Sequence, residues 1–308
     1  MRKYILHIVL VALVAPFSAF GAYHINNSNS TNIVGSMSQS ANKDTINWSK
    51  QKTAPWFVDR FKIGAGFFAA TTTTDIELGN STGGPIGSKI DFEKDFGLKR
   101  NVETFMANFQ WRISRRWRMD FSYYQLNRSA SKNLERTVNF GDHTYNVNAT
   151  VSSFFNNTIY RASFGYAILA KPNAELGLLI GAHTLQSSIG VGLNAGGAGL
   201  SYKDNFNFTA PLPDFGIWGG VALSKRLALN GEFDYLSISA GNFKGEIVGY
   251  NAALTFKALK QLDLSLGYTG FNFAIDANTN NQNAHVGWGY NGPSLTVDFR
   301  FGRNNWKH

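Results

Sequence analysis

The chain has no cysteine, few prolines and few charged side chains. Its 308 residues include 7 prolines, and only 16% of them are charged, against about 25% in soluble domains. The lack of cysteine excludes disulfides, thiolate metal sites and a cysteine nucleophile. Mean hydropathy is only −0.18, and beyond the N-terminus no run is long enough for a membrane helix, which needs roughly 20 apolar residues. The 31 glycines and 25 phenylalanines suit strands instead.

Basic residues exceed acidic ones, and the formal net charge is +9. Such an excess can indicate nucleic acid, anionic lipid or acidic polysaccharide as a partner. The basic residues are scattered rather than gathered in runs, so we expect no nucleic-acid partner. No motif calls for a cofactor, and none is expected.

The first residues have the order of a secretory signal. Arg2 and Lys3 precede an apolar stretch of about twelve residues, and small residues at Ala19 and Gly21 suit a cleavage site. We therefore expect a signal peptide at 1–21. An Asn/Ser/Thr-rich segment at 22–55 is predicted to be a flexible periplasmic leader, with a lumen plug or a partner-binding tail as the alternative. The remainder, 56–308, is predicted to be one domain.

From Trp56 onward, apolar and polar residues alternate with a period of two. Because successive strand side chains point to opposite faces, each strand has one apolar, aromatic face and one polar face. The fold class is therefore all-β, a single transmembrane antiparallel β-barrel of about 10 strands, with eight or twelve as alternatives. The expected strands are 61–77, 101–113, 117–129, 156–169, 174–189, 213–223, 227–239, 244–257, 261–276 and 289–302.

Connections alternate between short and long. Short turns at 114–116, 171–173, 224–226 and 258–260 each carry Lys or Arg, whereas the connections on the other side are mostly longer. This asymmetry is typical of the outer membrane of Gram-negative bacteria, with short turns in the periplasm. The 129–155 connection contains a candidate hairpin at 137–142 that would project outside. We expect a monomer in contact with outer-membrane lipid and lipopolysaccharide.

The polar face carries charges that would line the lumen. A barrel of this size leaves little interior space, and unpaired buried charges are costly. We therefore expect an internal salt-bridge network, in which Arg112, Arg118, Asp263 and Arg300 lie near the periplasmic end within pairing distance. Its predicted members are Arg112, Arg118, Asp120, Arg161, Glu232, Asp234, Asp263, Asp298 and Arg300, and His183 and Lys257 share the face.

Catalytic candidates are few. Asp142 and His143 form an acid–His pair in a long outer loop, and His183 is expected toward the same rim. General-base catalysis needs a histidine near a carboxylate and a substrate, and no spacing supports that geometry. We therefore expect no enzyme and no metal site. An outer-membrane protease or lipid A-modifying hydrolase is the alternative.

Several motifs together resemble a family of uncharacterised proteobacterial outer-membrane β-barrel proteins. They lie at 90–98, 109–131, 159–166, 233–268 and 290–297. The closing segment 294–301 also resembles the terminal strand that the outer-membrane assembly machinery reads, although seven residues follow Phe301. The resemblance implies an outer-membrane barrel and no particular substrate.

These observations favour an integral outer-membrane barrel with a largely side-chain-filled lumen and a structural or surface role. In that role the outer loops would meet lipopolysaccharide or another ligand. A narrow pore for small solutes and a hydrolase at the outer rim are the alternatives.

Overall fold

The computed structural model describes residues 54–80, 89–140, 143–194, 200–279 and 282–302. The expected signal peptide and almost all of the expected leader lie outside these residues. The elements are β1 (Phe61–Asn80), β2 (Lys89–Asp91), α2 (Phe92–Asp95), β3 (Asn101–Arg112), β4 (Trp117–Asn133), β5 (Val138–Phe140), β6 (His143–Tyr145), β7 (Thr150–Ala170), β8 (Ala174–Asn194), β9 (Leu200–Ala222), β10 (Leu227–Ala240), β11 (Phe243–Lys257), β12 (Leu262–Thr279) and β13 (Gln282–Phe301).

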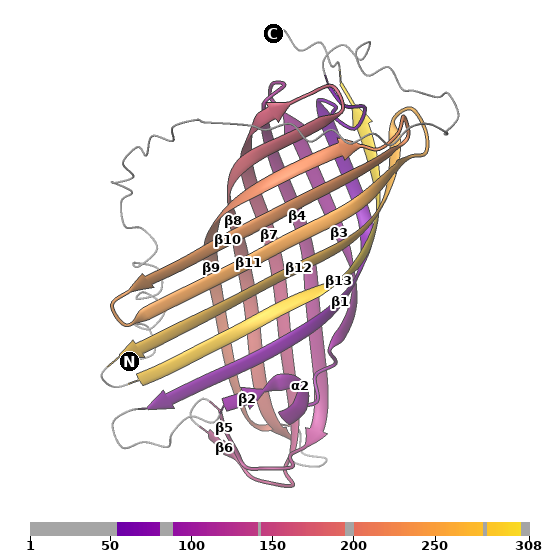
Figure 1. The fold of residues 1–308 in the computed structure, drawn as a ribbon. Helices are drawn as coiled ribbons and strands as arrows, with labels where there is room; N and C mark the ends of the chain where they lie inside the picture. The colour runs from indigo at the N-terminus through magenta and orange to yellow at the C-terminus, as the bar shows by residue number, and fades with distance from the viewer. Residues whose placement is uncertain (1–53, 81–88, 141–142, 195–199, 280–281, 303–308) are drawn as a thin grey trace, which may run out of the picture. The chain divides into compact units, whose positions relative to one another are not determined.

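Ten long strands form a closed antiparallel barrel (Figure 1). Each strand pairs with its neighbours in the barrel order, and β13 returns to pair with β1 from Phe61↔Phe301 to Asn80↔Gln282. The short strand β2 lies along β1 beyond the point where β3 begins. The predicted fold class and strand number are confirmed.

The outer surface of the barrel carries an apolar band. On β7 the outward positions are apolar from Tyr160 to Ile168, a span of nine residues, and a tilted strand needs roughly 9–11 to cross a bilayer. Trp117 stacks on Phe164 at one margin, with ring centroids 4.8 Å apart, and Tyr123 contacts Tyr160 at the other, 5.3 Å apart. Aromatic girdles with apolar residues between them mark the lipid-facing surface of an outer-membrane barrel.

The chain is thus an outer-membrane β-barrel, and the apolar band defines its membrane-spanning part. Among the described residues, no helix is long and apolar enough to cross a membrane. The end with short turns is called periplasmic here, because short turns mark that end of such barrels.

The segment 54–60 enters the periplasmic mouth of the barrel. Phe57 and Val58 are buried there against Ala222 and Ala228. Trp56 donates a hydrogen bond of 2.9 Å from Nε1 to the carbonyl oxygen of Ser224. The first described residues therefore cover part of the barrel's periplasmic opening.

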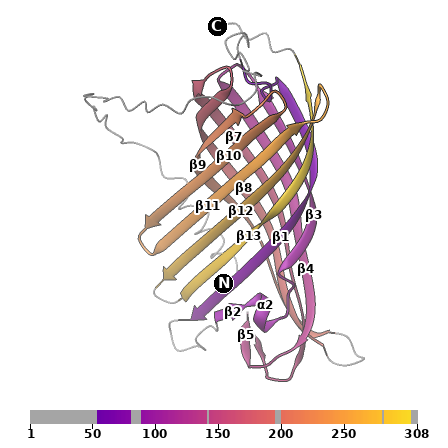
Figure 2. The same ribbon diagram turned by 45° about the vertical axis from the view of Figure 1, so that its right-hand side comes forward.

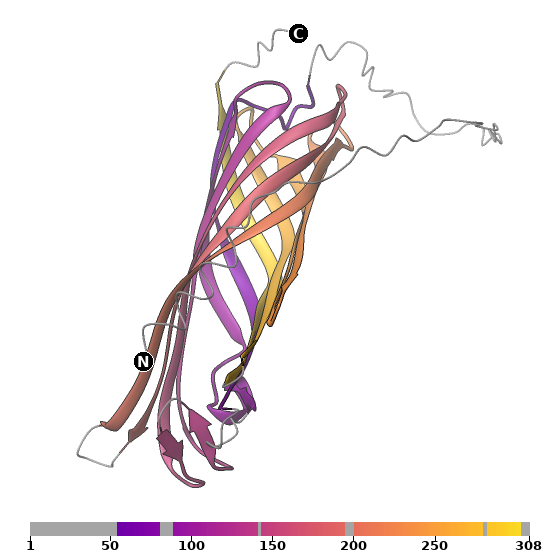
Figure 3. The ribbon, with the colours of Figure 1, turned by 90° about the vertical axis from the view of Figure 1, so that its left-hand side faces the viewer.

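Beyond the membrane, the barrel divides into two sheets (Figures 2 and 3). β3 and β4 pair only from Met106↔Tyr124 to Arg112↔Arg118, and β9 and β10 pair only as far as Phe215↔Tyr235. Beyond these points, on the side away from the periplasmic turns, β4, β7, β8 and β9 form one sheet, and β10 to β13 with β1 form the other. Together these two extensions are called the outer head.

Two prolines explain where the pairing of β9 with β10 ends. Ala222 donates its N–H toward β8, to Asn173, and Leu223 donates toward β10, to Leu227. Since successive N–H groups of a strand point to alternate sides, odd positions of β9 face β10. Pro211 and Pro213 occupy the odd positions after the last pair. Proline has no N–H, so the ladder has no donors there.

An apolar core fills the outer head. Both sheets contribute inward side chains, and α2 and the β5–β6 hairpin cover them, with Phe92, Phe96 and Tyr145 all fully buried. The hairpin forms close to its predicted position but packs on this core instead of projecting freely. It buries Val138 and Phe140. Burial of apolar surface stabilises the folded state by about 25 cal/mol for each Å² removed from water.

The strands of the outer head are longer than predicted. β9 begins at Leu200 rather than at 213, and β8 continues to Asn194. β7 begins at Thr150 and β13 at Gln282, earlier than 156 and 289. Glycines at the end of β8 and prolines in β9 suggested loops, but pairing with β8 holds the proline-containing part of β9 in strand conformation.

Candidate functional site: the barrel interior and the outer head

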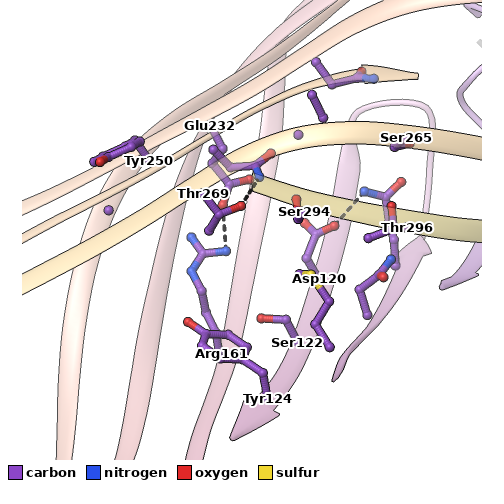
Figure 4. Close-up of a pocket in the computed structure, with 18 of the residues that line it drawn as sticks. Asp120, Ser122, Tyr124, Arg161, Glu232, Tyr250, Ser265, Thr269, Ser294 and Thr296 are labelled. Atoms are coloured by element: carbon purple, nitrogen blue, oxygen red, sulfur yellow. Dashed lines mark hydrogen bonds and ion pairs between the residues drawn. The ribbon is translucent and has the colours of Figure 1, made fainter. Parts of the chain in front are cut away.

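A polar cavity of about 280 Å³ lies in the middle of the barrel. Figure 4 shows Asp120, Arg161 and Glu232 at this cavity. Asp120 comes from β4, Arg161 from β7 and Glu232 from β10. Side chains from opposite walls of the barrel meet across the lumen, so residues more than a hundred positions apart in the sequence lie close together here. Serine, threonine and asparagine side chains of β11 to β13 line the opposite side.

Arg161 and Arg118 together form the centre of the charged interior. Arg161 lies 2.6 Å from Glu232 and 2.9 Å from Asp234, in each case from a guanidinium nitrogen to a carboxylate oxygen. Arg118 lies 2.6 Å from the other oxygen of Glu232 and 2.8 Å from Asp120. Glu232 therefore bridges the two arginines, and carboxylates neutralise both cations inside the barrel.

Trp218 supports the arginines on the periplasmic side of this cluster. The guanidinium of Arg118 lies 3.7 Å from the ring centroid and that of Arg112 lies 5.4 Å away. A side chain at Gly177 would overlap the indole ring, so the absence of a Cβ there makes room for it. Cation–π contact of this kind stabilises a desolvated arginine.

Arg112 pairs with Glu175, and Arg300 forms a second cluster at the periplasmic mouth. Arg112 Nη2 lies 2.7 Å from Glu175 Oε1. Arg300 Nε lies 2.6 Å from Asp263 Oδ2, and Arg300 also pairs with Asp59 and with the carbonyl oxygen of Trp56. The segment 54–60 is thus attached to the barrel wall through Arg300.

All nine residues expected in the lumen network point into the barrel. Asp298, the last of the acids, accepts a hydrogen bond of 3.0 Å from Asn108. Of the four expected near the periplasmic end, only Arg300 and Asp263 pair with each other, whereas Arg112 and Arg118 have other acids as partners. Lys257 lies 5.7 Å from the ring centroid of Trp56.

Sequence reasoning missed three carboxylates of the interior. Glu175 lies on the inward face of β8 and was detectable from the alternation. Asp214 lies within the expected strand 213–223, on the same face as Trp218, and was detectable in the same way. Asp59 precedes β1, and no periodic pattern places its side chain.

His183 is on the lumen face, as the alternation predicts, but it lies beside the central cavity and not toward the outer rim, which corrects its expected height. Its exposed fraction is 4%, its Nδ1 lies 2.9 Å from Asp214 Oδ2, and its ring lies 4.4 Å from that of Phe271. The His183 side chain points inward because odd-numbered positions of β8, such as 175 and 183, face the lumen. His143 begins β6 in the hairpin, and Asp142 lies outside the described residues. Among the described residues, no group of three His, Asp or Glu side chains is arranged to hold a metal ion.

A separate polar cluster lies on the outside of the outer head. His285 contacts two carboxylates, with Nδ1 2.6 Å from Asp276 and Nε2 2.9 Å from Asp75. Partial burial acts to lower the pKa of His285, but the two carboxylates outweigh it and raise that pKa above its ordinary value of 6.5. The cluster lies above the apolar band, where the strand surface meets water and lipid headgroups.

Comparisons with known proteins give structural likeness alone. The chain is similar to the outer membrane protease OmpT from Escherichia coli, with 12% identity and a TM-score of 0.49, over 80% of this chain and 100% of that one. It is similar to the NalP translocator domain from Neisseria meningitidis, with 12% identity and a TM-score of 0.40, over 79% and 89%. It is also similar to Ail from Yersinia pestis, with 12% identity and a TM-score of 0.32, over 77% and 97%. No family model and no curated protein matches it.

Proposed function

We propose that the protein is a non-conducting surface protein of the outer membrane, in which a filled barrel holds the outer head as a rigid binding platform. The observation that carries this proposal is that side chains occupy the interior at three successive levels. The segment 54–60 lies at the periplasmic mouth, the arginine–carboxylate clusters lie in the membrane, and the apolar core lies outside it.

The middle level favours a structural role over conduction. Arg118 and Arg161 are each held by two close carboxylates, so neither side chain can move without breaking ion pairs in a low-dielectric interior. An open pore would instead keep its charged groups solvated. The cavity of about 280 Å³ lies between the two covered ends.

A surface role also agrees better than hydrolysis with the positions of His143 and His183, the two histidines that the sequence suggested as catalytic candidates. A general base needs access to its substrate, but His183 is buried against Asp214 and Phe271. His143 lies in the hairpin beside Tyr145, with ring centroids 6.5 Å apart. The protein is therefore proposed to bind at the surface and not to cleave.

Planar-bilayer conductance tests the filled lumen. The full chain should give no stable current steps under conditions where a general porin does. Arg161→Ala should also remain closed, because it weakens only the middle level and leaves both ends covered. Stable steps of uniform size from the unaltered protein would overturn the proposal and favour a narrow pore.

A further inference from the structure

The two sheets of the outer head present chemically different surfaces to their surroundings. On the sheet of β10 to β13 and β1, outward positions above the apolar band carry charged or titratable groups, among them Lys244, Glu246 and His285. On the sheet of β4, β7, β8 and β9, the outward positions carry no charge from 125 to 133, from 150 to 158, from 184 to 192 and from 205 to 209. These outward positions are called the neutral face.

The neutral face consists mainly of amide and hydroxyl side chains in cross-strand rows. One row runs Gln125, Thr158, Gln186 and Thr209, and the next runs Asn127, Asn156, Ser188 and Asn207. Within the first row, Gln125 donates a hydrogen bond of 3.4 Å to Thr158. Amides and hydroxyls both donate and accept hydrogen bonds, so the rows offer an extended set of neutral polar groups.

A hollow of about 430 Å³ interrupts the neutral face further from the membrane. Ser129, Ser131 and Ser152 contribute hydroxyls to it, and Gly190 leaves room for a neighbouring ring. Phe154 stands between them, and its ring edge lies over Gly190, where any side chain would overlap it. The hollow therefore combines one aromatic ring with several hydroxyl groups.

From this combination we infer that the hollow and the row beside it, which contains Asn127 and Asn156, bind uncharged sugars, namely the outer-core hexoses of the lipopolysaccharide that surrounds the barrel. Sugars present hydroxyl groups for hydrogen bonding and C–H surfaces for contact with an aromatic ring, so amides, hydroxyls and Phe154 match them. Phosphorylated or acidic sugars would call for Lys or Arg, which the two rows lack, although Lys203 pairs with Gly192 at the far edge of the hollow. The inference rests on the proposed surface role and names the ligand class of the outer head.

The position of the neutral face identifies the source of the sugars. Its first row follows directly after the Tyr123–Tyr160 pair that marks the outer margin of the apolar band. Phe154 lies six residues beyond Tyr160 on the same strand, or roughly 20 Å along it. Lipid inserted beside this margin would place its innermost, acidic sugars near the first rows and its neutral outer-core hexoses near the hollow.

Binding to two defined lipopolysaccharides tests the inference. The full-length protein in detergent is titrated with lipopolysaccharide that carries outer-core hexoses and with a deep-rough form that ends before them. We expect the first to bind about tenfold more tightly, because two or three additional hydrogen bonds and one ring contact contribute. The delipidated oligosaccharide should compete with the first form only.

Two variants separate the neutral face from the rest of the surface. Phe154→Ala combined with Asn156→Ala should abolish the preference for the hexose-bearing form, whereas Glu246→Gln on the charged sheet should retain it. Equal binding of both lipopolysaccharides, or an unchanged preference in the double variant, would overturn the inference. The conductance of these variants is measured in parallel, so that a leaking barrel, which contradicts the proposed function, is distinguished from an intact barrel that does not recognise sugars.

Discussion

Arg112 and Glu175 meet through two hydrogen bonds in the periplasmic half of the barrel, 2.7 Å from Nη2 to Oε1 and 3.1 Å from Nη1 to Oε2. Their side chains are 1% and 4% exposed. The pair joins β3 to β8 across the lumen, and Arg115 contributes a second cation 2.9 Å from Glu175. Glu175 is thus the partner of two arginines at once.

Glu175→Ala should therefore destabilise the barrel strongly. It leaves Arg112 buried beside other cations, and loss of one member of a buried pair costs about 3–5 kcal/mol. The free energy of unfolding in urea, measured in lipid vesicles, checks this. The double variant Arg112→Met with Glu175→Leu should recover most of the loss. If it is as unstable as the single variant, the ion pair is not the cause.

The contact of α2 with the barrel wall gives a second prediction. Arg128 is buried and pairs with Glu93 and with Thr74. Glu93→Ala should loosen α2 and increase hydrogen exchange at its backbone, while the membrane-spanning strands stay protected.

The matched control for α2 is Glu135→Ala. Glu135 pairs with Lys132 at 3.0 Å, but its side chain is 76% exposed, so its loss should change stability by less than about 1 kcal/mol. Equal exchange at α2 in the two variants would contradict a role for the buried pair.

The raised pKa of His285 gives a pH dependence. A histidine whose pKa is raised on folding stabilises the folded state below its unfolded pKa of 6.5, and the stabilisation disappears as pH rises through the raised folded value. Since the cluster is partly exposed, the change should be below about 1 kcal/mol. Titration of the His285 imidazole by NMR measures the pKa, and Asp276→Asn should lower it. A pKa at or below 6.5 in the unaltered protein contradicts the prediction.

Replacing both prolines of β9 tests why its pairing stops. Pro211→Thr with Pro213→Thr restores two N–H donors on the side that faces β10. Backbone amides at these positions, and those of Ser237 and Ser239 opposite, should gain protection from hydrogen exchange if the missing donors keep the sheets apart. Rapid exchange at all of these positions would show that the divergence has another cause.

The sequence predicted the membrane-spanning part of the fold well and the outer head poorly. Alternation is regular where lipid contacts one face, so the strands around Trp117 and Leu264 are unambiguous. The outer head has apolar residues on its inward face, as a soluble protein does. Phe155 and Trp288, which resemble girdle residues near strand ends, lie inside it.

Parity explains which interior residues were predictable. Arg118 and Asp263 are at polar positions of regular strands, and their inward direction follows from the period of two. Which acid each arginine meets depends on the shear and closure of the barrel. The contact of Arg118 with Glu232 on β10 could therefore not be predicted from the sequence. His183 was placed correctly on its strand but at the wrong height, because the strand extends further than predicted.

The apolar core of the outer head also bears on how the protein is assembled. Phe92, Tyr145 and Ile189 belong to one core that lies beyond the lipid, so they must pass the membrane before they can meet one another. Removal of their apolar surface from water drives their final association. This step takes place on the far side of the bilayer, after the strands are in place. Once formed, the outer head would have to unpack its core before it could return through the lipid. It therefore secures the inserted barrel against withdrawal into the periplasm.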